Sequence, residues 1–529
     1  MSLLTILILV PVVTVVAITM VPASNRNAIR GLALFGTLAA FAVSLLVLAR
    51  FATGEAGMQL EHSLAWIPEW GISYHVGVDG ISLLLVLLTT VIMPLAVLAS
   101  WEQTKRLKGF FASLVALEAT LIGVFVALDL IVFYVFFEVM LVPMYALIGI
   151  WGGANRRYAS MKFFLYTLLA GLLMLVGILY LYFSTGAVSF DYATILANLD
   201  LSTAEQVWLF LAFFIAFAIK VPVFPVHTWL PDAHTEAPTA GSVILAAIML
   251  KIGGYGFLRF CLPYFPQASV DIAPIILGLG VIGVLYGAAV AMMQGDFKKL
   301  VAYSSVSHLG FVVIGAFAFN VTAVSGSVVQ MVNHGLSTGA LFLLIGFMYD
   351  RTHSRMISDY SGMLKAAPVF GGLFLVTIMS SIALPGLNGF VGEFPILLGA
   401  FQTVAWAAVL ATFGVILAAM YLLWAYQRMF HGPVEGLSVG LADLGVREVL
   451  VIAPLVVLMV GIGLYPEPLY ERVDPSVTAV VEQVRAEADL SGTAFADAEG
   501  TAATRSNSAP DAADAVAAPG AANVQGQGE

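Results

Sequence analysis

The chain has 529 residues, of which 60% are hydrophobic and only 10% are charged, and its mean hydropathy is +0.98. Soluble globular domains do not sustain such a composition, so we expect a polytopic membrane protein. The single cysteine, Cys261, excludes a disulfide framework, a cysteine-based zinc site and a thiolate-bound iron–sulfur cluster in this chain. The formal net charge of −10 says little about partners, because much of it lies near the C-terminus.

Apolar stretches long enough to cross a bilayer recur along most of the chain. The first, 2–20, has no basic residues ahead of its apolar core, so we expect it to remain as a span rather than to be cleaved as a signal peptide. With the later stretches it gives fourteen expected transmembrane helices. The later ranges are near 29–50, 81–100, 109–127, 129–150, 162–184, 206–227, 241–261, 271–293, 300–319, 326–348, 367–399 with a break, 402–427 and 447–465.

Basic residues gather on one side of this arrangement, as the positive-inside rule predicts for the cytoplasmic side. Alternate loops on that side hold fifteen of the 22 lysines and arginines. Both termini are therefore predicted on the non-cytoplasmic side. The fifteen residues are Arg26, Arg30, Lys105, Arg106, Lys108, Arg156, Arg157, Lys162, Lys298, Lys299, Arg351, Arg355, Lys365, Arg428 and Arg447.

The last segment, 482–529, differs in composition from the rest of the chain. It is rich in Ala, Gly and Ser, has one aromatic residue, Phe495, and carries eight acidic residues against Arg485 and Arg505, a net charge of −6. Such a segment cannot bury enough apolar surface to fold, so we predict a disordered acidic tail.

A lysine and two prolines interrupt the apolar run 210–227. Pro222 and Pro225 lack backbone N–H groups, so carbonyls near Lys220 lose their helical partners at a depth where lipid offers none. We therefore expect a broken helix whose break faces protein or water. A lysine beside unwound backbone inside a membrane indicates an ion or proton site.

A second interrupted run, 382–395, resembles the first, with a proline and glycines inside an apolar sequence. Spans four to eight and nine to thirteen would then form two inverted five-helix repeats, each with a broken fourth helix. The spacing of ionisable residues agrees, since Glu138 precedes Lys220 by 82 residues and His308 precedes Glu393 by 85. The predicted regions are 1–108 for the first three helices, 109–262 and 271–430 for the repeats, 431–481 for the last helix and its flanks, and 482–529 for the tail.

Ionisable residues are expected near mid-membrane at seven positions. Each could serve packing through a hydrogen bond or a fixed salt bridge, or it could exchange protons. Lys251 favours proton exchange, because it is central in an apolar span rich in small residues. The seven residues are Glu118, Glu138, Lys220, Lys251, His308, His334 and Glu393.

The loop after the first break contains His227, Asp232, His234 and Glu236. These residue types can bind metal, but their spacing fits no regular zinc pattern, and polar groups at the mouth of a proton path or in a capped loop explain them as well. The sequence has no dinucleotide fingerprint, P-loop or nucleophile elbow, so we expect no redox or hydrolytic machinery in this chain.

Several strings match a known pattern: 136–145 (FFEVMLVPMY), 220–234 (KVPVFPVHTWLPDAH), 303–310 (YSSVSHLG) and 389–394 (GFVGEF). They resemble the antiporter-like subunits of respiratory complex I, and the likeness covers about residues 1–470. The string 350–355 (DRTHSR) and Glu393, where sister subunits tend to have lysine, favour one type among these subunits.

The resemblance implies an all-α subunit of a proton-pumping NADH:quinone oxidoreductase in a bacterial cytoplasmic membrane. It implies that flavin mononucleotide and iron–sulfur clusters reside in other subunits, and that two homologous antiporter-like subunits and the lipid bilayer, but no nucleic acid, are the partners. The implied proton relay consists of the pair Glu138 and Lys220, the central Lys251 and His308, and the outward-facing end Glu393. Possible accessory residues are Glu118, His334, His227, Asp232 and His234.

Three other functions remain compatible with the sequence. A subunit of a cation/proton antiporter of the Mrp type would share the same repeats. A membrane subunit of a hydrogenase or formate hydrogen-lyase complex would differ in its partner genes. A scaffold whose buried charges form locked pairs is the purely structural alternative.

Overall fold

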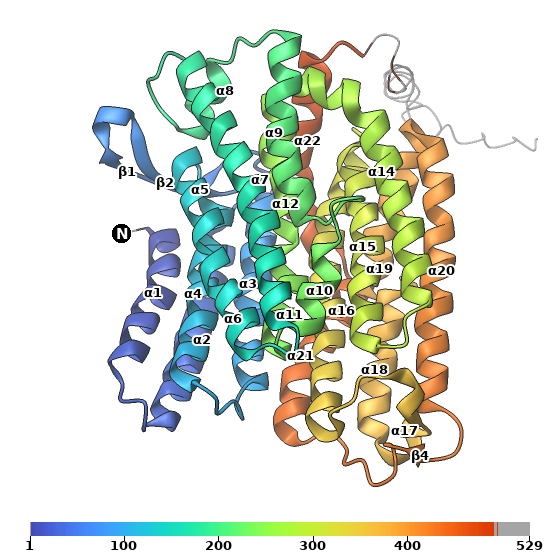
Figure 1. The fold of residues 1–529 in the computed structure, drawn as a ribbon. Helices are drawn as coiled ribbons and strands as arrows, with labels where there is room; N and C mark the ends of the chain where they lie inside the picture. The colour runs from blue at the N-terminus through green and yellow to red at the C-terminus, as the bar shows by residue number, and fades with distance from the viewer. Residues whose placement is uncertain (1, 491–492, 494, 496–529) are drawn as a thin grey trace, which may run out of the picture.

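A computed structural model describes residues 2–490, 493 and 495, and it shows a bundle of helices that lie roughly side by side (Figure 1). Within these residues, 13 helices are long and apolar enough to cross a membrane. They are α1 (Leu3–Met20), α2 (Arg26–Arg50), α3 (Gly80–Ala99), α4 (Leu107–Val126), α5 with α6 (Leu130–Trp151), α7 (Arg156–Ser184), α9 (Thr203–Lys220), α11 to α13 (Thr239–Tyr264), α14 (Pro266–Met292), α15 (Phe297–Ala316), α16 (Val321–Thr352), α20 (Ala405–Phe430) and α21 (Val446–Leu464).

The remaining predicted span is the interrupted one, which forms α18 (Pro368–Ser381) and α19 (Asn388–Thr403). The prediction of a helical membrane protein with about fourteen spans and two broken helices is thus confirmed. The expectation of an all-α chain needs one correction, because the predicted loop 51–80 contains an antiparallel hairpin of β1 (Gln59–Ile67) and β2 (Ile72–Val78), with a 3-10 turn, Pro68–Trp70, between the strands. A second pair, β3 (Tyr360–Ser361) and β4 (Glu435–Gly436), is only two residues long.

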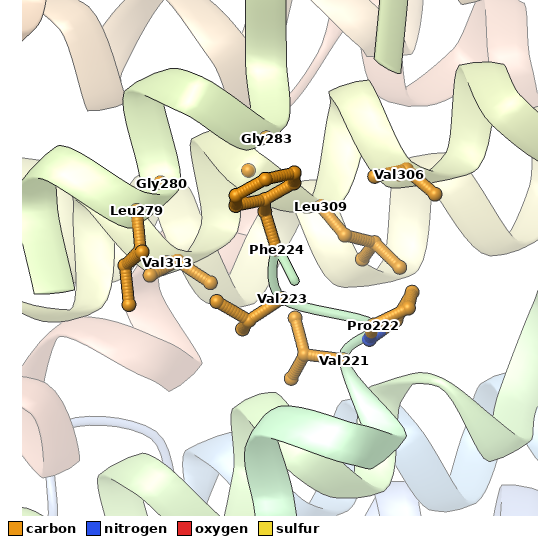
Figure 2. Close-up of a pocket in the computed structure, with 11 residues that line it drawn as sticks. Val221, Pro222, Val223, Phe224, Leu279, Gly280, Gly283, Val306, Leu309 and Val313 are labelled. Atoms are coloured by element: carbon orange, nitrogen blue, oxygen red, sulfur yellow. The ribbon is translucent and has the colours of Figure 1, made fainter. Parts of the chain in front are cut away.

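The first broken helix ends where the sequence predicts. α9 stops at Lys220, and the chain resumes as α10 (Trp229–Glu236). Trp229 Nε1 donates to the carbonyl of Ile219 over 2.9 Å, so one carbonyl freed by the break gains a partner. Figure 2 shows the break against apolar residues of α14 and α15, among them Leu279 and Leu309. The break therefore faces protein, as expected.

The second break is held by two amide side chains. Asn333 on α16 donates to the carbonyl of Asn388, the first residue of α19, over 2.6 Å, and Asn388 donates back to Asn333. These bonds join the first residue of α19, directly after the break, to the middle of α16. The interruption is thus fixed to the long central helix α16.

Two π-helical segments flank Lys251 within the span Thr239–Tyr264. They are Leu245–Met249 and Phe257–Cys261, and between them lies α12 (Lys251–Gly256). A π turn shifts the backbone hydrogen-bond register and occurs often at functional sites. Here the carbonyl of Ala246 accepts from Lys251 Nζ. The sequence analysis did not predict these π-helical segments.

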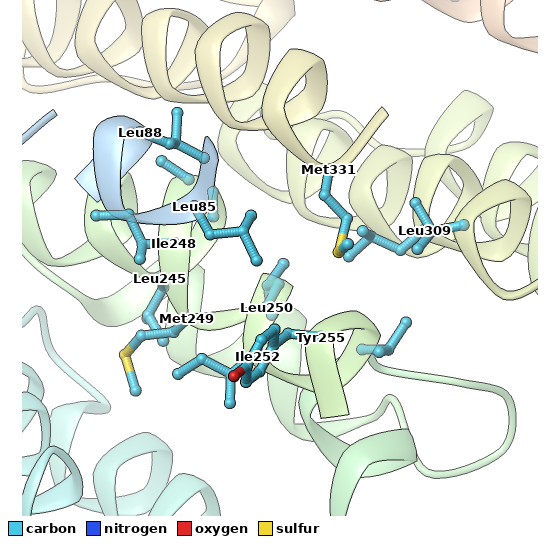
Figure 3. Packing of buried hydrophobic residues seen from close by; sticks show 14 of the residues in the cluster. Leu85, Leu88, Leu245, Ile248, Met249, Leu250, Ile252, Tyr255, Leu309 and Met331 are labelled. Atoms are coloured by element: carbon cyan, nitrogen blue, oxygen red, sulfur yellow. The ribbon is translucent and has the colours of Figure 1, made fainter. Parts of the chain in front are cut away.

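The interior around this span is tightly packed (Figure 3). Leu85 and Leu88 of α3 lie beside Leu245 and Ile248, and Met331 of α16 approaches from the other side. Every residue in the most apolar stretch of this span is buried. Ionisable groups on it are therefore shielded from lipid by neighbouring helices.

The predicted tail boundary at 482 is wrong, because a helix, α22 (Glu467–Glu487), runs through it. Its buried positions recur every three or four residues from Val473 to Val484, and this amphipathic pattern packs the helix onto the bundle. Arg485 donates to the carbonyl of Phe319 over 2.8 Å, and the rings of Phe319 and Phe495 lie 4.8 Å apart. Residues 496–529 lie outside the described part of the chain, so the predicted disorder there stays a prediction.

A histidine of the β hairpin contacts the residue directly before α8 (Tyr192–Ala197). His75 on β2 contacts Asp191 through Nδ1 at 2.6 Å and Glu61 through Nε2 at 2.9 Å. The hydrogen bond to Asp191 is the main cause of the raised pKa of His75. Burial opposes ionisation of Asp191, but hydrogen bonds from His75 and Thr194 outweigh it and lower the pKa of Asp191.

We predict that this attachment weakens in alkaline solution. The raised pKa of His75 means that its stabilising contribution is complete below its ordinary value of 6.5 and is lost as pH rises through the folded value. The lowered pKa of Asp191 means that its contribution is present above its ordinary value and is lost in strong acid. Hydrogen exchange of the hairpin amides, corrected for intrinsic rate, should therefore accelerate from neutral to alkaline pH.

The matched variants are His75→Gln and His62→Gln, which replace the two histidines of the hairpin. The first should remove the pH dependence, because glutamine does not titrate, whereas the second should keep it. An unchanged pH profile in His75→Gln would contradict this account of the attachment.

Candidate functional site

The structure brings Lys251 into contact with a histidine of the central helix. Lys251 Nζ lies 2.7 Å from Nδ1 of His334 on α16, in addition to its contact with the carbonyl of Ala246. Both residues are fully buried. The sequence analysis identified His334 only as a possible accessory residue. This contact makes it a direct partner of Lys251 in the candidate site.

His308 and Glu393 form a second buried contact. Nδ1 of His308 lies 2.6 Å from Oε1 of Glu393, and Gln330 Nε2 donates to the same oxygen over 2.8 Å. The three residues come from α15, α19 and α16. The two groups that the sequence separated by 85 residues are therefore direct partners.

A small polar cavity separates these two contacts. The rings of His308 and His334 have centroids 5.9 Å apart, and Nε2 of each ring is buried without a hydrogen-bond partner in the described part of the chain. The cavity beside them has a volume of about 10 Å³, and Gln330, Asn333, Ser337 and polar groups near the break of α18 and α19 also line it. That volume is close to the minimum for one water molecule, and polar groups surround it.

The partners of the two histidines determine which ring nitrogen of each carries the proton. A charged Lys251 has no lone pair, so it must donate to Nδ1 of His334, and the neutral His334 then carries its proton on Nε2. An ionised Glu393 can only accept, so His308 carries its proton on Nδ1 and offers a lone pair at Nε2. A donor and an acceptor thus converge on the cavity, the arrangement that a bridging water requires.

Glu138 and Lys220 are neighbours but do not form a closed ion pair. Their charges interact, yet no contact within 4 Å joins them, and Lys220 Nζ has no hydrogen-bond partner among the described residues. Lys220 instead lies 4.7 Å from the ring centroid of Phe137. Oε1 of Glu138 packs against Gly171, where an added Cβ would lie 1.6 Å away. The predicted pair is open in this structure.

Lys220 lies close to the helix that carries Lys251. A Cβ added at Gly253 would lie 2.4 Å from the carbonyl oxygen of Phe217 and 2.8 Å from the amide nitrogen of Val221. Only glycine therefore permits α9 and α12 to approach this closely. The approach brings the first break and the central lysine into one packed unit.

The remaining predicted residues occupy three different settings. Glu118 on α4 is fully buried, and within the residues that the structure describes both carboxylate oxygens lack a hydrogen-bond partner. Asp232 forms an ion pair with Lys162 at 2.7 Å, while the ring of His227 lies against Phe224 and Tyr286.

The predicted loop 227–236 is mostly helix α10, and its residues do not gather into a metal site. His234 stacks on Phe342 with ring centroids 4.6 Å apart, and Glu236 accepts from the amide of Asn155. No group of three or more His, Cys, Asp or Glu side chains with metal-binding geometry occurs within the described residues. The metal interpretation of this loop therefore has no support in the structure.

Sequence reasoning missed several residues that belong to the same interior. Gln330 lies four residues before His334, hence on the same face of α16, and that spacing could have identified it. The buried ion pair of Asp79 and Arg259 joins the start of α3 to the second π segment. No local signal relates these two residues, which are 180 positions apart.

A larger cavity opens on the side that is rich in basic residues. It has a volume of about 490 Å³, and its lining includes Lys298, Glu236 and Phe342. Lys298 Nζ donates to the carbonyl of Ala237 over 2.6 Å. His234 stacks on Phe342 and lies within electrostatic range of both Lys298 and Lys251.

Comparison with known proteins agrees with the fold. Residues 127–419 match the family model described as NADH:quinone oxidoreductase/Mrp antiporter, TM, and residues 3–124 match NADH-ubiquinone oxidoreductase chain 4, amino terminus. The fold superposes on a chain of respiratory complex I from Thermus thermophilus with bound NADH, with a TM-score of 0.84 and 32% identity, over 91% of this chain and 99% of that one. A chain of the Mrp complex from Dietzia shares the fold with a TM-score of 0.79 at 22% identity, over 92% of this chain and 100% of that chain.

The fold and its buried charges thus define an antiporter-like membrane subunit. Subunit M of NADH-quinone oxidoreductase from Rhodobacter capsulatus is 47% identical over 478 residues, which are 88% of this chain and 93% of that protein. Chain 4 of NADH-ubiquinone oxidoreductase from Marchantia polymorpha is 42% identical, over 90% of this chain and 96% of its own length. The chain belongs to the family of NADH-quinone oxidoreductase subunit M, the counterpart of chain 4.

We predict that Gly253→Ala destabilises the protein, because the new methyl group would meet backbone atoms of α9 that cannot move aside. Overpacking of this kind costs about 1–3 kcal/mol. Gly278→Ala on α14 is the control, since nothing lies within 4 Å of an added Cβ there. Alanine is also more favourable than glycine in a helix interior by up to about 1 kcal/mol. The midpoint of thermal unfolding of the purified complex should fall for the first variant only. Equal midpoints would show that the two helices are not in close contact.

Proposed function

We propose that this chain is a proton-translocating membrane subunit of NADH:quinone oxidoreductase. The observation that carries the proposal is a line of buried groups that joins four helices. It runs from Lys251 to His334, across the small cavity to His308, and on to Glu393. Its members are ionisable, they alternate as donors and acceptors, and each is close to the next. A scaffold of locked ion pairs would not leave ring nitrogens unpaired around a polar cavity.

Proton transfer along this line requires no charged histidine. Lys251 passes a proton to Nδ1 of His334, and His334 releases its Nε2 proton to a water in the cavity. That water gives a proton to Nε2 of His308, and the Nδ1 proton of His308 moves to Glu393. One positive charge leaves the lysine, one carboxylate is neutralised, and both histidines change tautomer. The histidines must then return to their first tautomers before the next proton.

Uptake from the cytoplasm would begin at the larger cavity. The proposal that its side of the membrane is cytoplasmic rests on the fifteen basic residues of that side. Lys298 lines the cavity, and His234 is within electrostatic range of both Lys298 and Lys251. This arrangement gives roles to His234 and to a lysine that the sequence did not single out.

Glu138 and Lys220 would couple this line to events elsewhere in the complex. In the open pair, the charge of Lys220 is not neutralised by a contact and repels a proton on Lys251. When the pair closes, Glu138 offsets that charge and Lys251 holds its proton more readily. Opening and closing would therefore alternately load and discharge the central lysine. The proximity of α9 and α12 at Gly253 supports this coupling.

The redox chemistry would belong to other subunits. Iron–sulfur clusters are proposed there because Cys261 is the only cysteine of this chain. Flavin mononucleotide is proposed there because the family resemblance implies it. The partners would be the other membrane subunits of the complex, including two homologous antiporter-like subunits. The two broken helices also support inverted repeats at 109–262 and 271–430.

A subunit of a cation/proton antiporter is the second candidate, because the Mrp complex has the same fold. At 22% identity this likeness concerns the fold alone. Sodium-dependent proton flux in the absence of NADH would favour it, whereas flux that requires NADH and quinone supports the first proposal.

Substitution of Lys251 tests whether proton transfer passes through this line. Lys251→Arg keeps a positive charge that cannot be released at physiological pH, and Lys251→Met removes the charge with little change in length. We expect both variants to assemble and both to lose most NADH-driven proton pumping in membrane vesicles. Pumping at the parent rate in Lys251→Arg would mean that this lysine does not titrate during turnover.

Filling the small cavity tests the bridging water. Ser337→Val places extra carbon atoms at a wall of the cavity while all ionisable residues remain. Without the bridging water, a proton must cross an apolar gap, which raises the activation free energy by more than about 1.4 kcal/mol. We therefore expect proton pumping to fall at least tenfold. Ser327→Val is the control on the same helix, because Ser327 is equally buried but bonds to Val312 outside the cavity. Equal pumping by the two variants would remove the water from the path.

A further inference from the structure

A second polar cavity lies where four spanning helices end. It has a volume of about 310 Å³ and is formed by the loop between α1 and α2, the loop between α3 and α4, and the first residues of α2 and α4. Three basic side chains line it: Arg26, Arg106 and Lys108. We refer to it as the basic cavity. None of its seven lining residues is acidic.

The three cations of the basic cavity have no partner within the described residues: none forms an ion pair or a side-chain hydrogen bond. Neighbouring basic residues differ, since Arg30 donates to the carbonyl of Gln103 and Lys105 to that of Ile150. The one acidic residue of the adjoining loop, Glu102, is paired with Arg447 at 2.9 Å. Within the described part of the chain, no carboxylate therefore neutralises the positive charge of the cavity.

Apolar surface leads directly to this cavity. Val13, Val16 and Met20 lie on one side of α1 and are 62%, 53% and 79% exposed, and α1 ends at Met20, three residues before the cavity residue Ala23. A row of exposed apolar side chains on a spanning helix contacts acyl chains or another membrane helix. The cavity at its end lies at the level of lipid headgroups.

We propose that the basic cavity binds the phosphate of an anionic phospholipid whose acyl chain lies along α1. Arginine recognises phosphate through paired N–H donors, and lysine adds a point charge. Basic pockets between membrane helices are suited to acidic headgroups. The inference does not depend on the proton path, which lies in the interior of the bundle.

The test uses the whole complex in nanodiscs of phosphatidylcholine that contain a small fraction of photoactivatable phosphatidylglycerol. Mass spectrometry should find the crosslink on peptides that contain residues 20–26 or 104–109. The triple variant Arg26→Gln, Arg106→Gln, Lys108→Gln should reduce labelling by roughly a hundredfold, since each cation at a membrane surface contributes about a factor of five. Replacing the two arginines with lysine should retain most of the labelling.

The control triple variant is Arg157→Gln, Lys299→Gln, Lys365→Gln, which removes three exposed cations from the same side of the protein but outside the cavity. It should label like the parent. An equal loss in both triple variants would reduce the effect to general surface charge and overturn the proposal. Equal labelling by photoactivatable phosphatidylcholine would also overturn it. Displacement of the lipid by inorganic phosphate would assign the cavity to a soluble anion instead.

Discussion

Every polar group inside this bundle must find its partner within the protein, because lipid supplies none. That constraint explains why each irregular stretch of backbone lies against another helix. The carbonyl of Ile219 at the first break accepts from Trp229, and the second break exchanges hydrogen bonds with Asn333. The carbonyl of Ala246, next to Lys251, accepts from that lysine. Where a polar atom lacks such a partner, as at Nε2 of His308 and His334, the exception marks a place for chemistry.

The central helix α16 connects the parts of the proposed relay. It is 32 residues long, and the whole of its hydropathic core is buried. At one level it presents Gln330 to Glu393, and one turn further His334 to Lys251. Asn333, between them, holds the second break. A rotation of α16 would alter all three contacts together, which makes this helix the natural place for a change at one site to reach the other.

The open state of Glu138 and Lys220 gives the chain a second arrangement that a static ion pair would exclude. Burial makes an unpaired lysine costly in free energy, and the rings of Phe137 and Phe163 offset part of that cost through cation–π contacts. The carboxylate of Glu138 is held against Gly171 without a hydrogen bond from that side. Because neither partner is fully satisfied, small shifts of α5 or α9 can change their interaction, which suits a proposed coupling element.

The amino-acid sequence by itself determined the membrane class, the number of spans and the position of both breaks. Hydrophobic length, proline and glycine act through local chemistry that is the same in any tertiary structure. It also identified Lys251, His308 and Glu393 as ionisable residues near mid-membrane, because a charged side chain in an apolar run is costly in free energy wherever it packs.

Only the tertiary structure decided which of these groups meet. The contact of Lys251 with His334, the role of Gln330 and the pair of Asp79 and Arg259 join residues from different helices. Helix packing, which depends on many side chains at once, sets these distances. The start of the tail was misplaced for the same reason, since the charged composition after 482 hid the apolar face with which α22 packs on the bundle.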